Sequence, residues 1–475
     1  MKYTSTCGGV SNLTFEQALF STGFVKDGGL LMPESVPVVS QDTLKEWKDL
    51  SYPELCKRIV PLFISEQEIP RNDLNALLDR AFSKFSIAEV VKVARLKDDL
   101  NIAELWHGKT LAFKDLALSC VGQFLEYFLK KRKKNVTAIV ATSGDTGSAA
   151  IESVRGLEWI DIVVLLPQGR ITKIQELMMT TVLDDNVHVM AGENSTSDDL
   201  DVVVNKLYMD QEFKEHNRLM TINSINWARV MVQVAHFFFS YFQVCESCDQ
   251  TVDIIVPTGG CGNVTAGCVA KFMGLPIKLV CAVNSNDIVH RIIQNGDYSL
   301  TEVVHTWASA MDIQIPYNFQ RILWLTSGKD TELVSKLMKQ YDDTGKFVIP
   351  DDLLKQLQSI FSSYSLDDDG ILKIMQKCWH DNEYLLCPHT AVAAGCHYER
   401  KSEQSRPSAC IATASPVKFP EAVLKAGLTP QTTPQVEALE SMQTKYILLR
   451  EGDDWEKILR EKIKSLTSAA QKSKE

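Results

Sequence analysis

Short apolar runs alternate with longer amphipathic segments through the middle of the chain. Each apolar run has the length of a strand, whereas each longer segment repeats its apolar positions with the period of a helix. Strands that are joined by helices form parallel sheets, which the helices cover. The pattern therefore predicts an α/β fold, with strands at 136–141, 160–166, 186–190, 252–256 and 277–283 and helices at about 115–132, 147–156, 172–183, 197–209, 226–244 and 264–273.

The same pattern divides the chain into three regions. Residues 1–95 open with turns and continue with helical periodicity, which predicts a small α-rich N-terminal domain. Residues 96–430 contain the alternating pattern, together with a helix-rich extension at about 300–380. Residues 431–475 predict a C-terminal helical segment with a polar tail, which we expect to fray after Leu466.

The most apolar stretch of the chain runs from Val230 to Val244. It is interrupted by Gln233, His236 and Ser240. A membrane-spanning helix needs about 20 consecutive apolar residues, so this stretch is too short to cross a bilayer. It predicts a buried helix, and we expect no membrane partner.

Composition and charge narrow the class of protein. The 475 residues are 45% hydrophobic and carry a formal net charge of −10, so we expect a globular protein that does not bind nucleic acid. The basic run 130–134 predicts the end of a helix, where cations face the negative end of the helix dipole. The 12 cysteines show no disulfide spacing and the N-terminus resembles no signal peptide, so we expect free thiols and a cytoplasmic location.

Two stretches resemble metal sites only weakly. Residues 245–248 form a single CxxC pair without a second pair. Calcium-loop spacing in the acidic stretch 365–370 puts Ser365 and Gln376 at the first and last ligand positions, where the loop requires carboxylates. The sequence thus predicts no metal site, and it predicts a helix N-cap around Asp369.

Lys114 is the first candidate for chemistry. It lies between Phe113 and Asp115, after a polar turn and at the start of a helical segment. Apolar neighbours lower the pKa of a lysine, and its neutral amine can attack a carbonyl group. The alternative is an ordinary lysine on the first turn of an amphipathic helix.

Two loops at strand ends are candidate anion sites, because ligands of parallel α/β sheets bind at the carboxyl ends of the strands. Residues 142–148 combine hydroxyl residues with two glycines ahead of a helix, so their backbone N–H groups favour a carboxylate or a phosphate. Residues 257–263 hold three glycines in four positions and suit a phosphate. Either loop could instead be a plain turn. The second loop lacks both P-loop and GxGxxG spacing, so a cofactor smaller than a dinucleotide fits it best.

A lysine that can form a Schiff base, a glycine-rich phosphate loop and a second anion loop together suggest pyridoxal phosphate. Five segments are similar, in the same order, to motifs of the threonine synthase family: 104–115, 142–147, 223–229, 257–263 and 413–419. The resemblance runs from Tyr3 to about Gly427. Within the family the chain most resembles an animal branch, for example at 310–318 and 422–430.

The resemblance implies a fold-type-II pyridoxal-phosphate enzyme of the tryptophan synthase β-like class. Residues 96–430 would be its catalytic core, with two domains built on parallel sheets. Pyridoxal 5′-phosphate is the implied cofactor, and Lys114 would bind it as a Schiff base. Thr413 would face the pyridine nitrogen, and the phosphate would lie against Gly259, Gly260, Cys261, Gly262 and Asn263. The substrate, a small phosphorylated amino acid, would contact Ser143, Gly144, Asp145, Thr146, Asn226 and Arg229.

Some of these residues have simpler explanations. Thr413 is also typical of a strand-end hydroxyl bonded to the backbone, and Asn226 and Arg229 of a helix start with an exposed salt bridge. The chain also departs from the usual family pattern at Cys7 (Arg), Lys109 (Pro), Gly260-Cys261 (Asn-Phe) and Ser415 (His). We expect these changes to shape the substrate end of the pocket.

The activity implied by the animal branch is the elimination of phosphate from O-phosphohomoserine or O-phosphothreonine, which gives 2-oxobutyrate, ammonia and phosphate. One alternative is threonine synthase itself, which converts O-phosphohomoserine to threonine. Another is a catalytically silent relative that acts as an interaction or signalling protein. Periodicity alone leaves the oligomeric state open.

Overall fold

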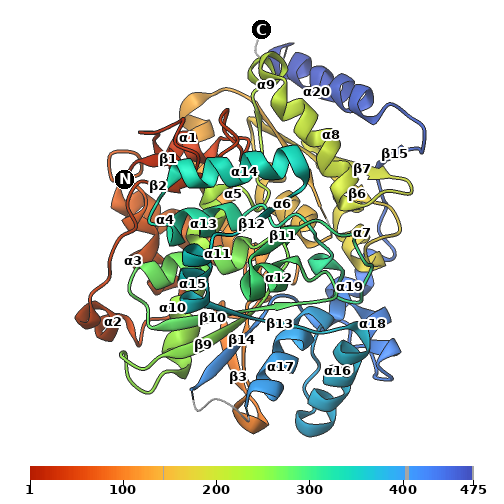
Figure 1. Cartoon of the computed structure of the whole chain (residues 1–475). Coiled ribbons are helices and arrows are strands. Elements are labelled where there is room, and N and C mark those ends of the chain that lie inside the picture. Colours follow the sequence, from red (N-terminus) through yellow and green to blue (C-terminus); the bar gives the residue numbers. More distant parts are fainter. Residues whose placement is uncertain (143, 402–405, 473–475) are drawn as a thin grey trace.

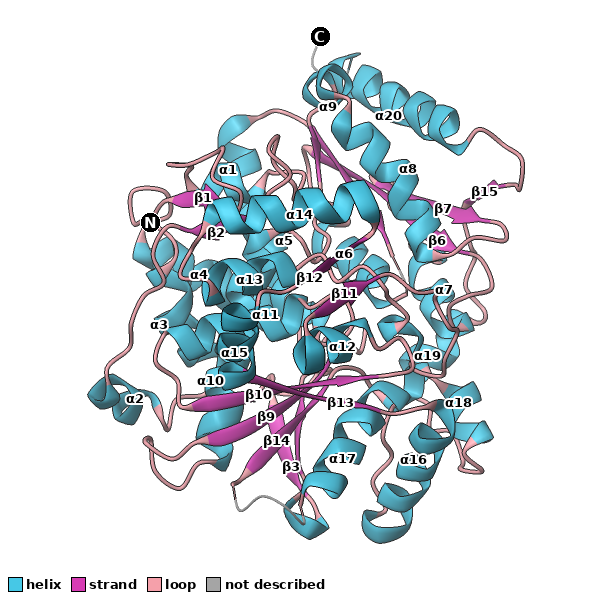
Figure 2. Cartoon of the chain, in the orientation of Figure 1, coloured by secondary structure: helices cyan, strands magenta, loops and turns pink. Residues whose placement is uncertain are grey.

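The structure, a computed structural model, describes residues 1–142, 144–401 and 406–472. Figure 1 shows the N-terminal region beside the helices of the main α/β unit, with the final helix at the opposite edge. Figure 2 shows the strands of the two larger sheets as separate groups, one at the bottom of the view and one at the upper right.

The first large sheet contains six strands: β3 (Lys92–Arg95), β4 (Asn101–Glu104), β9 (Val252–Pro257), β10 (Ile277–Val283), β13 (Phe361–Ser365) and β14 (Ser408–Ala412). Their order across the sheet is β13-β10-β9-β14-β4-β3. The edge strand β3 is antiparallel to β4, and the other pairs are parallel. All of β9 is buried, as expected for a central parallel strand covered on both faces.

The second large sheet contains five strands, all parallel: β5 (Val136–Ala141), β6 (Ile160–Pro167), β7 (Val187–Gly192), β8 (Leu219–Met220) and β15 (Ile447–Leu449). Their order is β15-β7-β6-β5-β8. The edge strand β15 comes from the C-terminal segment, which we predicted to be helical.

Helices connect and cover these strands. They are α5 (Lys114–Arg132), α6 (Asp145–Val154), α7 (Lys173–Thr180), α8 (Ser197–Met209), α9 (Gln211–His216), α10 (Trp227–Val244), α11 (Gly262–Phe272), α12 (Ile288–Asn295), α13 (Phe319–Thr326), α14 (Thr331–Thr344), α15 (Asp351–Ile360), α16 (Asp368–Asn382), α17 (Pro388–Arg400), α18 (Pro420–Lys425), α19 (Pro434–Leu439) and α20 (Trp455–Lys472). A small antiparallel pair, β11 (Asp297–Ser299) and β12 (Lys346–Val348), lies in the helix-rich extension.

The N-terminal region packs on α10. It contains a two-stranded antiparallel sheet, β1 (Tyr3–Ser5) and β2 (Leu31–Pro33), and the helices α1 (Phe15–Leu19), α2 (Gln41–Trp47), α3 (Tyr52–Ile59) and α4 (Arg71–Phe82). The ring of Tyr3 lies 6.2 Å from that of Trp227, and the ring of Tyr52 lies 5.9 Å from that of Phe239. Because α10 also packs against α5 and α11, it is buried from Trp227 to Phe242, as its sequence predicted.

The predicted strands and helices of the central pattern are all present. Within the two large sheets the sequence prediction missed β3, β4, β8, β13, β14 and β15, each of which has at most five residues. It also missed the short strands of the two antiparallel pairs, β1 with β2 and β11 with β12. Two helices begin earlier than predicted: α6 begins at Asp145 and α11 at Gly262. The last residues of each predicted anion loop, 145–148 and 262–263, therefore belong to the first turns of these helices.

Three smaller predictions can also be compared with the structure. The basic run 130–134 does end a helix, since α5 ends at Arg132. The N-cap of α16 is Asp367, a neighbour of Asp369, and its carboxylate accepts a hydrogen bond from the N–H of Gly370 at 2.8 Å. The 12 cysteines are free.

We predicted that the tail frays after Leu466. For residues up to Lys472 this is wrong, because α20 continues to Lys472. Leu459 and Ile463 are fully buried against α8, and the hydroxyl of Thr467 lies 2.9 Å from Oδ1 of Asn217.

Among the described residues, no helix combines the length and the apolar character that crossing a bilayer requires.

The contact between α5 and α6 gives a stability prediction. A Cβ atom at Gly122 of α5 would lie 2.1 Å from the carbonyl oxygen of Ser153 on α6. Gly122→Ala should therefore push the two helices apart and destabilise the protein by about 1–3 kcal/mol, seen as a lower thermal midpoint. Lys130→Ala, at an exposed position of the same helix, is the control and should change stability by less than about 0.5 kcal/mol. An unchanged midpoint for Gly122→Ala would contradict this helix contact.

Candidate functional site

A cavity of about 170 Å³ lies where loops from both sheets meet. Its wall includes residues that follow β5, β9 and β14, together with the start of α5. The cavity therefore lies at the carboxyl ends of parallel strands, where the sequence pattern placed it. Of the predicted site residues, it brings together Lys114, Asp145, Thr146, Arg229, Gly259, Gly260, Cys261, Gly262, Asn263 and Thr413.

Backbone hydrogen bonds fix Lys114 relative to Thr413. The N–H of Phe113 donates to the carbonyl oxygen of Thr413 at 2.7 Å, and Ala112 forms a β-bridge with Ala414. The chain reaches this position through Leu111, which has a φ of 56°. Two segments about 300 residues apart in sequence are thus joined directly at the cavity wall.

The amine of Lys114 is sheltered and close to a carboxylate. Its side chain is 13% exposed, and Nζ lies 3.6 Å from Oδ2 of Asp145. Burial lowers the pKa of Lys114 to about 8; Asp145 acts in the opposite direction, and the charges of Arg229 and Lys418 lower it further. The direction agrees with the sequence prediction, and at pH 8 about half of the amines are neutral.

Lys418 is a member of the site that the sequence did not single out. Its side chain is fully buried, and its ammonium group lies 2.6 Å from Oδ1 of Asp145 and donates to the carbonyl oxygen of Thr110 at 2.8 Å. The amide of Gln175 donates to the same carboxylate oxygen at 2.8 Å. Burial opposes the ionisation of Asp145, but Lys418 and Lys114 outweigh it and lower its pKa below the ordinary value.

The first anion loop surrounds the start of α6. The hydroxyl of Thr142 accepts hydrogen bonds from the N–H groups of Gly144 and Gly147, both at 3.0 Å. Gly144 has a φ of 129° and packs against Gln175, and it does not line the cavity, whereas Asp145 and Thr146 do. Ser143, another predicted contact, lies outside the described residues.

The second loop surrounds the start of α11. All five predicted phosphate-binding residues, 259–263, line the cavity. Cys261 precedes the helix with a φ of 61°, and no side chain of the described residues caps the helix N-terminus. The first N–H groups of a helix need hydrogen-bond acceptors, so this end suits an anion.

His236 is a further residue that the sequence did not identify. Its Nε2 lies 2.8 Å from Oδ1 of Asn263, and burial lowers its pKa to about 4, so the ring is neutral and Nε2 donates. This bond turns the Nδ2 group of Asn263 away from His236. That group has no hydrogen-bond partner among the described residues, although Asn263 lines the cavity.

Arg229 and Asn226, predicted as a pair, differ in position. Arg229 is 1% exposed and lines the cavity; Nη1 donates to the carbonyl oxygen of Ile222 at 3.0 Å, and Nε has no partner among the described residues. Burial lowers its pKa to about 10. The exposed salt bridge considered from the sequence is therefore wrong.

Asn226 does not line the cavity. It is the N-cap of α10, where Oδ1 accepts from the N–H of Ala228, and its amide group donates to the carbonyl oxygens of Leu19 and Thr221, both at 2.8 Å. All its hydrogen-bonding groups are thus used within the protein. Asn223, three residues earlier in the same motif, lines the cavity instead, and its Oδ1 has no partner in the part of the chain that the structure describes.

Three departures from the family pattern lie away from the cavity. Cys7, Lys109 and Ser415 are described residues, and none of them lines it. Cys7 is near Gln320, Lys109 is exposed, and the hydroxyl of Ser415 accepts from the N–H of Val417. These three residues therefore do not contact the cavity directly, whereas Gly260 and Cys261 line it.

Three family models match the chain. Residues 2–82 match the family model "Threonine synthase N terminus", residues 88–413 match "Pyridoxal-phosphate dependent enzyme" and residues 390–460 match "Threonine synthase, C-terminal". Threonine synthase-like 2 of Mus musculus is 53% identical over 98% of both chains. Threonine synthase of Schizosaccharomyces pombe is 36% identical over 89% of this chain and 88% of its own.

A solved structure gives the same result for the fold. The crystal structure of pyridoxal-phosphate-bound threonine synthase from Brucella melitensis superposes with a TM-score of 0.91. It is 35% identical in sequence and covers 98% of this chain and 99% of its own.

The buried pair of Asp145 and Lys418 gives a second prediction. Lys418→Met removes one partner and leaves a buried carboxylate with Lys114 alone, so we expect a loss of about 3–5 kcal/mol in stability. In the double variant Lys418→Met/Asp145→Asn no carboxylate is left unpaired, so part of that loss should be recovered.

The measurement is the thermal midpoint of the cofactor-free protein, with the exposed Lys425→Met as control. The single variant Asp145→Asn is measured as well. If the stability loss of the double variant equals the sum of the losses of Lys418→Met and Asp145→Asn, the two charges do not interact.

Proposed function

The chain belongs to the threonine synthase family of pyridoxal-phosphate-dependent enzymes, and from that premise we propose that it is a phospho-lyase. Its substrate in this proposal is O-phosphohomoserine, O-phosphothreonine or both. Loss of inorganic phosphate leaves an enamine, which takes up one molecule of water to give 2-oxobutyrate and ammonia.

The cavity fits pyridoxal 5′-phosphate, the cofactor of the family. The uncapped start of α11 offers N–H groups to a phosphate, and Asn263 has a free amide group beside them. Lys114 would bind the cofactor aldehyde covalently, and Thr413 would face its ring nitrogen. When bound, the cofactor supplies an acceptor for the electron pair that remains after a proton leaves Cα.

The observation that carries the proposal of a phosphorylated substrate is Arg229. A buried guanidinium group normally pairs with a carboxylate, because an unpaired buried charge is strongly unfavourable. Arg229 has no carboxylate partner among the described residues, and it lines the same cavity as Lys114. Arg321 is also fully buried without a carboxylate partner among the described residues, but it does not line the cavity and each of its nitrogens donates, to Leu31, Asn318 and Ile225. Nε of Arg229, in contrast, has no partner in the part of the chain that the structure describes.

In the proposed reaction each residue has a defined task. Arg229 holds the substrate phosphate by charge-assisted hydrogen bonds, as does the amide of Asn223 in its alternative orientation. The amine of Lys114, once released by the substrate amine, takes the Cα proton as general base. Asp145 and Lys418 hold that amine in place. The N-terminus of α6, with Thr146, faces the substrate carboxylate.

A substitution behind the cavity wall favours the lyase over the synthase. A synthase must deliver water to the β-carbon, which needs additional positioned polar groups, whereas a lyase only releases its product. The family usually has His at the position of Ser415, next to the segment that carries Thr413 and Lys418. In this chain the hydroxyl of Ser415 caps the turn 416–418. The imidazole of the usual His is therefore absent from this position beside the site.

Threonine synthase is the second candidate, and the close match to the Brucella melitensis structure over nearly the whole chain favours it. The two reactions share the binding of cofactor, the removal of the Cα proton and the loss of phosphate. They differ only in the final product.

A product assay tests the proposal. The purified protein with bound cofactor is given O-phosphohomoserine and, separately, O-phosphothreonine, and phosphate, 2-oxobutyrate and threonine are measured. We expect 2-oxobutyrate in equal amount to the phosphate released. Threonine as the main product would replace the lyase by the synthase.

Lys114→Ala is the matched control for this assay. It should abolish phosphate release and the visible absorbance of the lysine-bound cofactor. If the unchanged protein neither takes up the cofactor nor releases phosphate, the catalytically silent alternative is correct.

A further inference from the structure

His389 is a buried histidine of the cavity wall to which the proposed reaction gives no task. It is the second residue of α17 and is 2% exposed. It lines the cavity together with Lys114 and Thr413, and its ring centroid lies 4.8 Å from that of Phe419. No described side chain of the cavity wall fixes which ring nitrogen of His389 carries the proton. A hydrogen bond from the backbone does.

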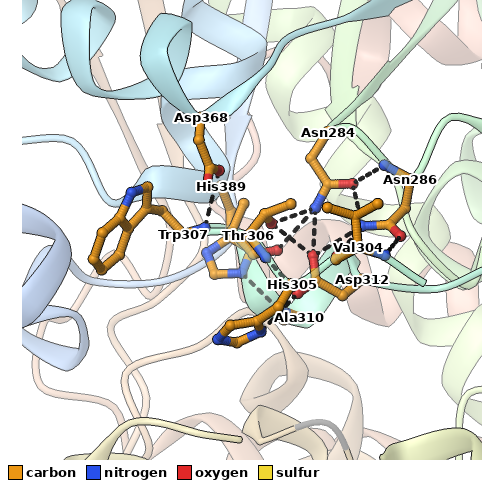
Figure 3. Close-up of polar contacts among 11 residues, drawn as sticks. Asn284, Asn286, Val304, His305, Thr306, Trp307, Ala310, Asp312, Asp368 and His389 are labelled. Carbon is orange, nitrogen blue, oxygen red and sulfur yellow. Dashed lines mark hydrogen bonds and ion pairs between the residues drawn. The ribbon is translucent and has the colours of Figure 1, made fainter. Parts of the chain in front are cut away.

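The backbone of Ala310 fixes the tautomer of His389. The N–H of Ala310 donates to Nε2 at 3.1 Å (Figure 3). A backbone N–H can only donate, so Nε2 has no hydrogen and a neutral ring carries its proton on Nδ1. Nδ1 is buried and has no hydrogen-bond partner among the described residues.

The ring also stays neutral. Burial lowers the pKa of His389 to about 4; Asp145 favours the charged form, whereas Lys114 and Lys418 oppose it. The geometry acts in the same direction, because a proton on Nε2 would point at the N–H of Ala310. With Nδ1 already protonated and Nε2 occupied, His389 is suited neither to accept a proton nor to give one up. What remains is a hydrogen-bond donor.

The segment that holds His389 is itself firmly held. The carboxylate of Asp312 accepts from the hydroxyl of Thr306 at 2.6 Å and from the amide of Asn284 at 2.7 Å, and Asp368 accepts from the N–H of Trp307 at 3.0 Å. Figure 3 shows these bonds on either side of Ala310. They give the peptide of Ala310 a defined orientation.

The next peptide of the chain, between Ala310 and Met311, lies beside the phosphate loop. A Cβ atom at Gly259 would lie 3.3 Å from the carbonyl oxygen of Ala310 and 3.1 Å from Cα of Met311. Ala310 therefore contacts the start of the phosphate loop with one side and His389 with the other. A donor oriented by the backbone of Ala310 is therefore oriented relative to the phosphate loop.

We propose that His389 donates its Nδ1–H to an anionic oxygen of the cofactor or substrate bound in the cavity, as an uncharged donor that keeps its proton throughout the reaction. The proposal rests on the proposed function in one respect, that the cavity binds pyridoxal 5′-phosphate and a phosphorylated amino acid. An uncharged donor suits a site that already contains Lys114, Lys418 and Arg229, because it stabilises an oxyanion without adding a further buried cation.

Two substitutions separate the two nitrogens of the ring. The amide nitrogen of Asn occupies nearly the position of Nδ1, so His389→Asn keeps the donor and loses the acceptor of Ala310. The amide end of Gln reaches the position of Nε2, so His389→Gln keeps that acceptor and loses the donor. Removing a hydrogen bond to a charged group weakens binding by about 10- to 100-fold. His389→Gln should therefore weaken the binding of cofactor or substrate by that factor, and His389→Asn should weaken it much less.

Two measurements identify the oxygen. The first is the dissociation constant of pyridoxal 5′-phosphate during reconstitution, and the second is KM for phosphate release from O-phosphohomoserine, which counts lyase and synthase turnover alike. If the oxygen belongs to the cofactor, His389→Gln raises the dissociation constant. If it belongs to the substrate, His389→Gln raises KM and leaves the dissociation constant unchanged. His380→Gln, at an exposed histidine of α16, is the control.

The outcomes that overturn the proposal are equally specific. His389→Asn impaired as much as His389→Gln would show that the bond to Ala310, and not the donor, is what matters. No effect of His389→Gln in either measurement would also refute it.

A third readout needs no activity. In the cofactor-free protein labelled with ¹⁵N at histidine, and assigned with the variants, His389 should be protonated at Nδ1 and unprotonated at Nε2 near neutral pH. The opposite tautomer would refute the proposal. If the protein releases no phosphate from either substrate, the proposed function fails, while the cofactor affinity and the ¹⁵N spectrum still test the role of His389.

Discussion

The ion pair between Asp145 and Lys418 is the interaction on which the rest of the site depends. It places a carboxylate 3.6 Å from the amine of Lys114, inside the protein and at the first turn of α6. Without Lys418 the carboxylate would have only one cation to balance its burial. With Lys418, Asp145 stays ionised and fixed beside Lys114, whose own pKa is lowered by burial. The charges that act on Lys114 are then Asp145, Lys418 and Arg229, so cations outnumber anions around this amine.

The fold brings this charge together with two helix N-termini. The helices α6 and α11 follow interior strands of different sheets, and both begin at the cavity. No side chain of the described residues caps α11, and at the start of α6 only Thr142 accepts, from the N–H groups of Gly144 and Gly147. Their backbone N–H groups and dipoles add attraction for anions without adding further ionised groups. One end is suited to the cofactor phosphate and the other to a substrate carboxylate, with Lys114 between them.

Much of this arrangement could be predicted from the sequence, because it follows from local patterns. The buried parallel strands give continuous apolar runs, and the loops that follow them have a recognisable composition. Lys114 and residues 259–263 were found in this way, Thr413 came from the resemblance to the family, and all line the cavity. The family and its cofactor followed from the order of the motifs.

The remaining residues depend on contacts between distant parts of the chain. Asn223 and Asn226 lie in one motif, and only the packing of α10 decides that the first faces the cavity while the second caps the helix. Lys418 lies within a recognised motif, but its partner Asp145 is far away in sequence. His389 is oriented by Ala310, 79 residues earlier, through a bond that no local pattern reveals.

The pKa of Lys114 in the cofactor-free protein tests the central claim most directly. The rate at which Lys114 reacts with a small amine-specific reagent can be followed by peptide mass spectrometry across a range of pH. A buried amine held by this charge cluster should become reactive with a midpoint at about pH 8. A midpoint near the ordinary lysine pKa of about 10.4 would contradict this account of Lys114.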